Sequence, residues 1–81
     1  MKSEKLRIRV TEGNRTKVDL TFGARVTENL PELIPDYLRP KLEQRAIDVS
    51  KIAKDAVAGH FEVGELFQLS EGGKTISVWL E

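Results

Sequence analysis

The sequence contains no cysteine and only one histidine, and these two absences exclude much catalytic and metal chemistry. Without cysteine the chain forms no disulfide, holds no metal through a thiolate and carries out no thiol catalysis. The single histidine, His60, has no second imidazole with which to build a zinc site, and the carboxylates do not show metal-loop spacing. We therefore predict no metal site and no cofactor.

Long apolar runs and an excess of one charge are also missing. No apolar run approaches the roughly 20 residues that cross a membrane, and residues 1–5 lack the apolar core of a signal peptide. The 13 basic and 13 acidic residues cancel, which argues against strong non-specific binding of nucleic acid by the whole chain. We expect a cytoplasmic protein without membrane insertion.

Chain length limits the size of the core. A chain of 81 residues forms one domain, and folding buries roughly 60–65% of the surface of an unfolded chain of this size. That allows one small core but little room for a deep substrate cavity. We predict a single domain over residues 1–81, with residues 1–4 flexible.

Residues 48–59 show the clearest pattern in the chain, that of an amphipathic helix. Asp48 can accept a hydrogen bond from a free amide of the first turn, and Gly59 can take the left-handed conformation that ends a helix. Between them four apolar residues follow the i, i+3, i+4, i+7 spacing of one helix face, namely Val49, Ile52, Ala53 and Ala56.

A strand pair is predicted on each side of this helix. Apolar and polar residues alternate over 5–11 and 17–22, around a turn at 12–15. The strands 65–70 and 75–80 flank a turn with two glycines, Gly72 and Gly73.

Residues 24–47 have helical spacing that prolines interrupt. A proline inside a helix costs about 3 kcal/mol unless it lies in the first turn. We therefore expect one helical piece around 24–36, which begins or kinks near Pro31, and a short helical turn from Pro40 to Arg45.

The order of two strands, helix and two strands predicts the fold class. Helices are the only cover available for the apolar faces of the strands. We predict an α+β fold, a two-layer ββ-α-ββ sandwich whose four-stranded, mostly antiparallel sheet is covered on one face by helices. The first and last strands are expected to lie side by side in the middle of the sheet.

Several segments of the chain are similar to a small bacterial domain. They are Leu6–Glu12, Lys17–Leu20, Ile47–Val49, Gly64–Phe67 and Gly73–Glu81. Together they resemble the small C-terminal domain of SHOCT-like proteins of the LiaX/YvlB kind. The resemblance implies a bacterial interaction or regulatory module linked to envelope stress, rather than an enzyme.

The residues themselves also give no sign of catalysis. His60 has no evident orienting partner, and the serines lack the G-x-S-x-G context of a nucleophile. The Gly72-Gly73 pair lies in a hairpin rather than between a strand and a helix, which is typical of a turn and not of a phosphate-binding loop. We predict no catalytic residue.

The outer face of the sheet, the face away from the helices, is the candidate binding surface. It is predicted to carry Lys5, Arg7, Arg9, Lys17, Gln68 and Trp79. Three interpretations remain open. The face can be a platform for single-stranded nucleic acid, a solvated surface on which Trp79 rests against basic side chains, or a protein interface.

The strand at 65–70 favours self-association. Residues 66–69 carry no charge, and at a sheet edge they lack the lysine or proline that blocks strand pairing. A second copy pairing there gives a homodimer, unless a helix or the segment 36–47 covers the edge. We predict a protein-interaction domain, with the small nucleic-acid-binding domain as the alternative. The predicted contact residues are Arg7, Arg9, Phe67 and Trp79.

Overall fold

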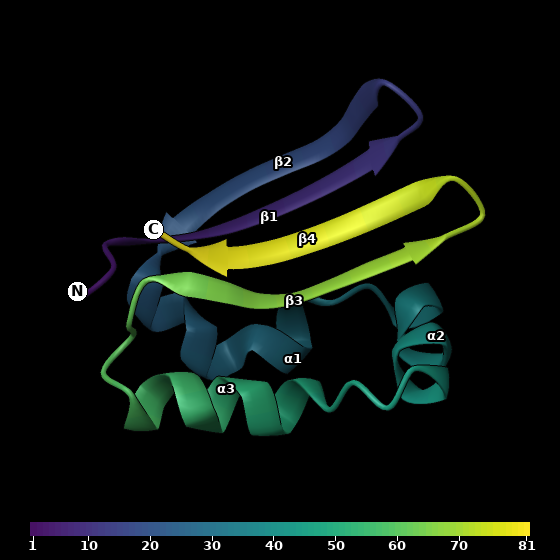
Figure 1. The fold of residues 1–81 in the computed structure, drawn as a ribbon. Coiled ribbons are helices and arrows are strands. Elements are labelled where there is room, and N and C mark those ends of the chain that lie inside the picture. Colours follow the sequence, from purple (N-terminus) through teal and green to yellow (C-terminus); the bar gives the residue numbers. More distant parts are fainter.

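Four antiparallel strands form one sheet in the order β2-β1-β4-β3 (Figure 1). The structure is a computed structural model that describes all 81 residues. The strands are β1 (Lys5–Glu12), β2 (Arg15–Gly23), β3 (Gly64–Glu71) and β4 (Lys74–Leu80). The first and last strands lie in the middle, as predicted, and the α+β sandwich is confirmed.

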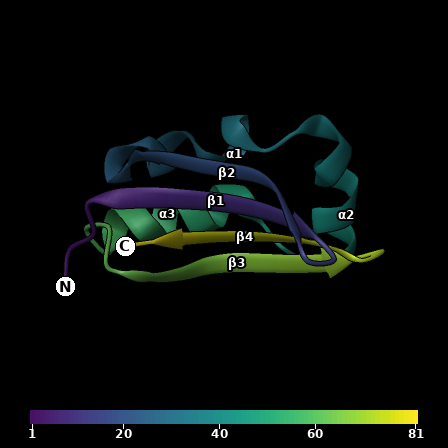
Figure 2. The same ribbon diagram turned by 90° about the horizontal axis from the view of Figure 1, so that it is seen from above.

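The helices lie on one face of the sheet, with α3 running along it (Figures 1 and 2). They are the 3-10 helix η1 (Ala24–Asn29), α1 (Leu30–Leu33), the 3-10 turn η2 (Asp36–Leu38), α2 (Arg39–Gln44) and α3 (Val49–Ala58). None of these helices is long and apolar enough to cross a membrane.

The prolines divide the segment before α3 as the sequence predicts. Pro31 and Pro40 each lie in the first turn of a helix, where the missing N–H has no partner to lose. Pro35 is extended and separates α1 from η2. The broken helix over 24–45 is therefore confirmed, although much of it has the tighter 3-10 geometry.

Asp48 begins α3 as predicted, because its Oδ1 accepts a hydrogen bond of 3.1 Å from the Lys51 N–H. The prediction for the other end is wrong. Gly59 has φ −84°, and the left-handed residues are His60 and then Phe61, each with φ 57°. The Phe61 N–H donates to the Ala56 oxygen and the His60 N–H to the Val57 oxygen, which is the Schellman pattern one residue later than expected.

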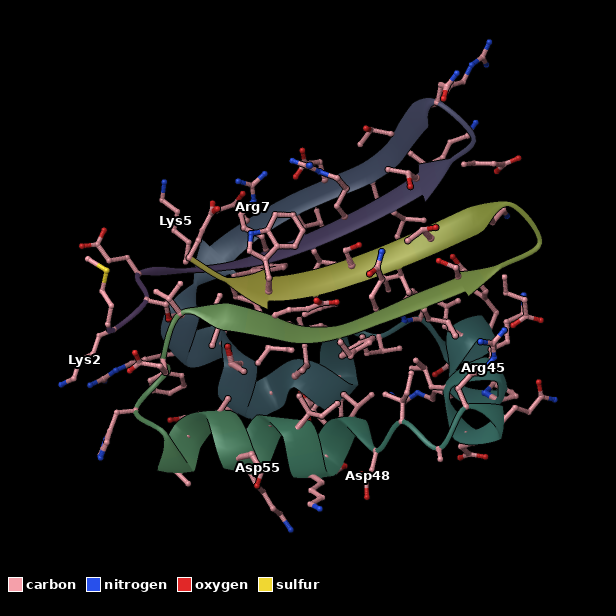
Figure 3. The ribbon with its side chains drawn as sticks, viewed as in Figure 1. Lys2, Lys5, Arg7, Arg45, Asp48 and Asp55 are labelled. Carbon is pink, nitrogen blue, oxygen red and sulfur yellow. The ribbon has the colours of Figure 1, made fainter.

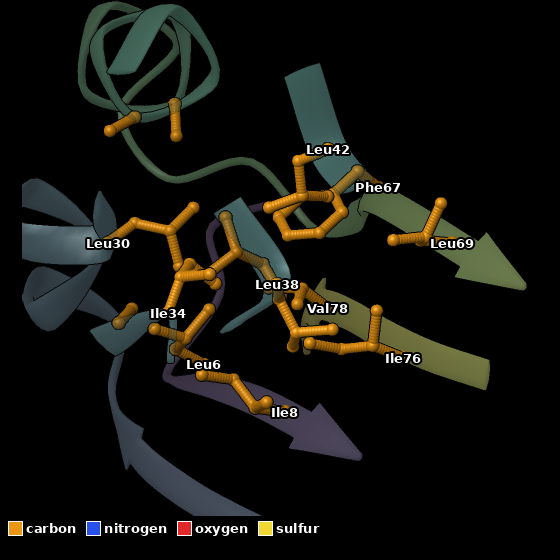
Figure 4. Packing of buried hydrophobic residues seen from close by; sticks show 14 residues of the cluster. Leu6, Ile8, Leu30, Ile34, Leu38, Leu42, Phe67, Leu69, Ile76 and Val78 are labelled. Atoms are coloured by element: carbon orange, nitrogen blue, oxygen red, sulfur yellow. The ribbon is translucent and has the colours of Figure 1, made fainter. Parts of the chain in front are cut away.

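One hydrophobic core of 14 residues lies between the two layers. Figure 4 shows side chains of the helical layer, among them Leu30 and Leu38, gathered against side chains of the sheet, among them Ile8 and Val78. Leu6, Leu30 and Val78 have no exposed surface. Each such side chain contributes roughly 1.5–3 kcal/mol through burial, so this cluster holds the helical layer on the sheet.

The N-terminal residues, which we expected to be flexible, are attached to the connector between α3 and β3. The N–H and the Oγ of Ser3 both donate to the Phe61 oxygen, at 2.8 and 2.6 Å. Lys2 forms an isolated bridge with Glu62, and the Val63 N–H donates to the Met1 oxygen. These bonds hold residues 1–3 beside the end of α3.

Ala46, just after α2, supplies a test of backbone strain. Its φ is 57°, and the Ile47 N–H donates to the Leu42 oxygen at 2.9 Å, so Ala46 occupies the left-handed position of a second Schellman motif. This conformation costs a non-glycine residue roughly 1–2 kcal/mol.

The variant Ala46→Gly is expected to raise the free energy of unfolding by about 0.5–1 kcal/mol, because glycine removes this strain but gains entropy in the unfolded chain. Urea denaturation followed by circular dichroism measures the change. Ala58→Gly, at the end of α3, is the control and is expected to be destabilising. If Ala46→Gly is less stable than wild type, the conclusion that Ala46 has a strained backbone is contradicted.

Candidate functional site

The candidate site is the outer sheet face around Trp79. The strand register places Arg7 of β1 directly opposite Trp79 of β4, and Arg9 opposite Asp19 of β2. Figure 3 shows Arg7 and Lys5 on the side of the sheet away from the helices. Period-two alternation explains this placement, because Leu6 and Ile8 point into the core from the same strand.

Trp79 lies against two guanidinium groups. The Cζ atoms of Arg7 and Arg9 are 5.4 and 5.2 Å from the centroid of its ring. Cation–π contacts at this kind of exposed site contribute about 0.5–1 kcal/mol. The indole is half-buried, so it is held in place and still reaches the surface.

Two carboxylates bind the same arginine. Arg7 Nη2 is 2.8 Å from Asp19 Oδ1, and Arg7 Nη1 is 2.8 Å from Glu81 Oε1. The second oxygen of Glu81 accepts a hydrogen bond of 3.2 Å from Trp79 Nε1. A second arginine, Arg9, lies 3.4 Å from Asp19 Oδ2. Both arginines that contact the tryptophan are thus paired with carboxylates of the same chain.

These contacts change the acid–base behaviour of the cluster. The hydrogen bond from Arg7 is the main cause that lowers the pKa of Asp19, and it is also the main cause that lowers the pKa of Glu81. In return, the hydrogen bonds to Asp19 and then to Glu81 raise the pKa of Arg7. The ion pairs therefore favour the charged form of each partner.

Three of the four predicted contact residues, Arg7, Arg9 and Trp79, come together on this face, and Phe67 does not. Phe67 is 7% exposed and faces the core, because it lies opposite the inward-pointing Val78. We therefore no longer regard it as a contact residue. The register shift between Glu65 and Phe67 is a β-bulge at Leu66, which strict alternation does not predict.

A shallow hollow of about 490 Å³ adjoins Trp79 on the side of β3. The side chains of Glu65, Gln68 and Ser77 line it together with the indole. Gln68 was predicted for this face, but the hollow was not. The bulge beside Glu65 leaves a trace in the sequence, because the consecutive apolar residues at 66 and 67 break the alternation.

Other predicted features lie away from this face. His60 is exposed just after α3, and its side chain forms no hydrogen bond.

A second hollow, of about 450 Å³, lies between α1, α2 and the start of α3. Its one arginine, Arg39, donates to the Pro31 oxygen at 2.8 Å and pairs with Asp36 at 3.2 Å. No set of nucleophile, base and orienting group is formed in either place.

Comparison of the chain with models of protein families, with curated proteins and with solved structures finds no match. The resemblance to SHOCT-like proteins therefore stays a prediction. Any functional conclusion depends on the geometry of the chain itself.

The ion pairs of Arg7 give a testable pH dependence. Because the pKa values of Asp19 and Glu81 are lowered on folding, their contribution to stability is present above their usual values of 3.8 and 4.5. This contribution to stability is lost as the pH falls through the lower pKa values that Asp19 and Glu81 have in the folded protein. The Arg7→Gln variant is therefore expected to lose less stability than wild type between pH 7 and pH 3.

Urea denaturation at several pH values measures this difference, and carboxyl resonances in NMR titrations report the two groups directly. In Arg7→Gln, the pH midpoints of the Asp19 and Glu81 titrations are both expected to rise. The matched control is Arg15→Gln, which removes the same charge from an arginine without an ion pair. Unchanged midpoints in Arg7→Gln contradict the pairing.

Proposed function

We propose that this chain is a non-enzymatic protein-interaction domain, and that Trp79 with Arg7 and Arg9 is its contact surface. The observation that supports this most strongly is the half-buried Trp79 at the rim of a hollow. Its ring is held against the guanidinium groups of Arg7 and Arg9, which are themselves paired with carboxylates. Tryptophan and arginine are the residues most enriched among those that dominate binding energy at protein interfaces.

Preorganisation strengthens the proposal. A side chain that becomes fixed on binding costs about 0.5–1.5 kcal/mol. Arg7 is already held by two carboxylates, and Trp79 by the Arg7 and Arg9 guanidiniums and Glu81. Much of this cost is therefore met during folding, and a partner meets a surface that is already formed.

Nucleic acid is the less supported alternative. A platform for single strands needs cations that are free to contact phosphates. Here Asp19 and Glu81 already pair with the two arginines, and Glu65 adds a further negative charge to the hollow. A protein surface, which can present groups of both signs, fits this arrangement better.

The resemblance described above supports a finer proposal. It places the domain in a bacterial cytoplasmic protein and gives it a regulatory role in envelope stress. Neither part of that proposal depends on the geometry around Trp79.

Selection from a phage-displayed library of random peptides tests the contact surface without a known partner. Peptides enriched on the wild-type protein are expected to bind Trp79→Ala at least tenfold more weakly, because a central tryptophan typically contributes 2 kcal/mol or more. Tyr37→Ala is the matched control, since Tyr37 is an exposed aromatic residue of the helical layer. Selected peptides that bind Trp79→Ala as tightly as wild type contradict the proposal.

A titration with single-stranded RNA of mixed sequence, followed by the fluorescence of Trp79, distinguishes the alternative. Under the protein-interaction proposal no saturable change is expected at physiological salt. Saturable binding that is lost in the Arg7→Glu, Arg9→Glu double variant favours the nucleic-acid platform instead.

A further inference from the structure

The free edge of β2 is the most open part of the sheet. Eight of its nine residues are exposed, and Figure 1 shows it as the strand farthest from α3. Val18 and Leu20 point to the helical side of the sheet, yet 37% and 43% of their surfaces are exposed. The helical layer therefore does not cover this strand.

The opposite edge, β3, is less open than the sequence suggested. Phe67 and Leu69 are buried in the core, and Arg45 Nη2 donates to the Ser70 backbone oxygen at 3.3 Å. This bond occupies a carbonyl group of the edge strand. Arg45 belongs to the segment 36–47, so that segment covers part of the edge, at the end of β3 near Ser70.

The hydrogen bonds at the start of β1 show which groups of β2 are free. Lys5 and Glu81 exchange two backbone bonds, whereas the Ala24 N–H donates to the Glu4 oxygen at 3.1 Å. Antiparallel ladders alternate, so even-numbered residues of β1 bond to β2 and odd-numbered ones to β4. It follows that Asp19 and Thr21 direct their N–H and C=O groups to the open edge.

We infer that a second copy of this chain pairs antiparallel along β2, with the two-fold axis at Leu20. This surface is separate from the contact surface around Trp79 and goes beyond that proposal. In the joined sheet, the helical layers of the two copies lie on the same side only when even-numbered residues of one β2 face even-numbered residues of the other β2. Centres near the middle of β2 pair the most residues of the strand, which leaves Val18, Asp19 and Leu20.

Charge and strand regularity select the centre at Leu20. Pairing about Asp19 sets the two Asp19 carboxylates face to face. Pairing about Val18 would include the irregular part of β2, where the register with β1 shifts between Thr16 and Val18. Pairing about Leu20 uses the regular part of the strand and sets Leu20 against Leu20 and Val18 against Phe22. These are pairs without mutual backbone bonds, whose side chains approach closely.

The same register keeps like charges from facing each other directly. Asp19 of one copy faces Thr21 of the other, and Lys17 faces Gly23, so no carboxylate opposes a carboxylate and no lysine opposes a lysine. The ion pairs of Asp19 with Arg7 and Arg9 of its own copy stay intact. The pairing is isologous, so it closes as a dimer.

Single-cysteine variants test the register, because the chain has no cysteine of its own. Leu20→Cys is expected to form a disulfide-linked dimer under mild oxidation, since its Cα atoms are about 4.5 Å apart in this pairing. Val18→Cys is the matched control and is expected to stay monomeric, because Val18 faces Phe22. Cross-linking of Val18→Cys as fast as Leu20→Cys overturns the register, and so does the absence of cross-linking in Leu20→Cys.

Light scattering on a dilution series tests the association without cross-links. Wild type is expected to form a dimer, and Leu20→Lys to raise its dissociation constant at least tenfold, because a charge on the inner face of an edge strand opposes pairing. Circular dichroism confirms that this variant folds. A wild-type monomer at millimolar concentration overturns the inference but not the contact surface. Loss of the dimer in Trp79→Ala also overturns it, and assigns the association to the outer face.

Discussion

The pairing of β1 with β4 is the interaction on which the rest of this structure depends. It joins the two ends of the chain over seven residue pairs, and the side chains that it brings inward, Leu6, Val78 and Leu80, are almost completely buried. Each hairpin alone would be a two-stranded ribbon, which is at best marginally stable in water. Together they present one apolar surface wide enough for the helical layer to cover.

The same pairing also builds the candidate site. Arg7 and Trp79 are 72 positions apart in sequence and directly opposite in the sheet, and Asp19 joins them from β2. The inner and outer faces of the central strands therefore cannot be altered independently. A shift of one residue in this register would exchange the core residues of β4 with its surface residues. The stability of the core thus fixes the position of the tryptophan.

Sequence patterns predicted the parts of the fold that local chemistry determines. Alternation identified the strands, Asp48 identified the start of α3, and the prolines divided the preceding helix. The end of α3 was misplaced, because Gly59 permits a left-handed conformation without requiring it, and the hydrogen bonds select His60. A sequence shows which residues tolerate a conformation, but tertiary contacts decide which residue adopts it.

The site was predicted in part for the same reason. Alternation was enough to place Arg7, Arg9 and Trp79 on one face. Phe67 was predicted as a contact residue because its strand was expected to offer an open edge, and the position of β3 in the sheet together with its bulge decides which groups of that strand remain accessible. Edges depend on strand order, and strand order depends on contacts between the two halves of the chain, which no local pattern contains.

The bonds between Glu81 and the start of β1 bring the two ends of the chain together. The N–H groups of Glu4 and Lys5 both donate to the Glu81 oxygen, at 2.8 and 2.9 Å, and both ends lie on the same side in Figure 1. A circular permutant that joins Glu81 to Met1 and opens the turn at Gly13 would therefore keep the same sheet. Its β4 and β1 would become neighbours in sequence. The slowest contact to close, which now spans the whole chain, would then be among the most local.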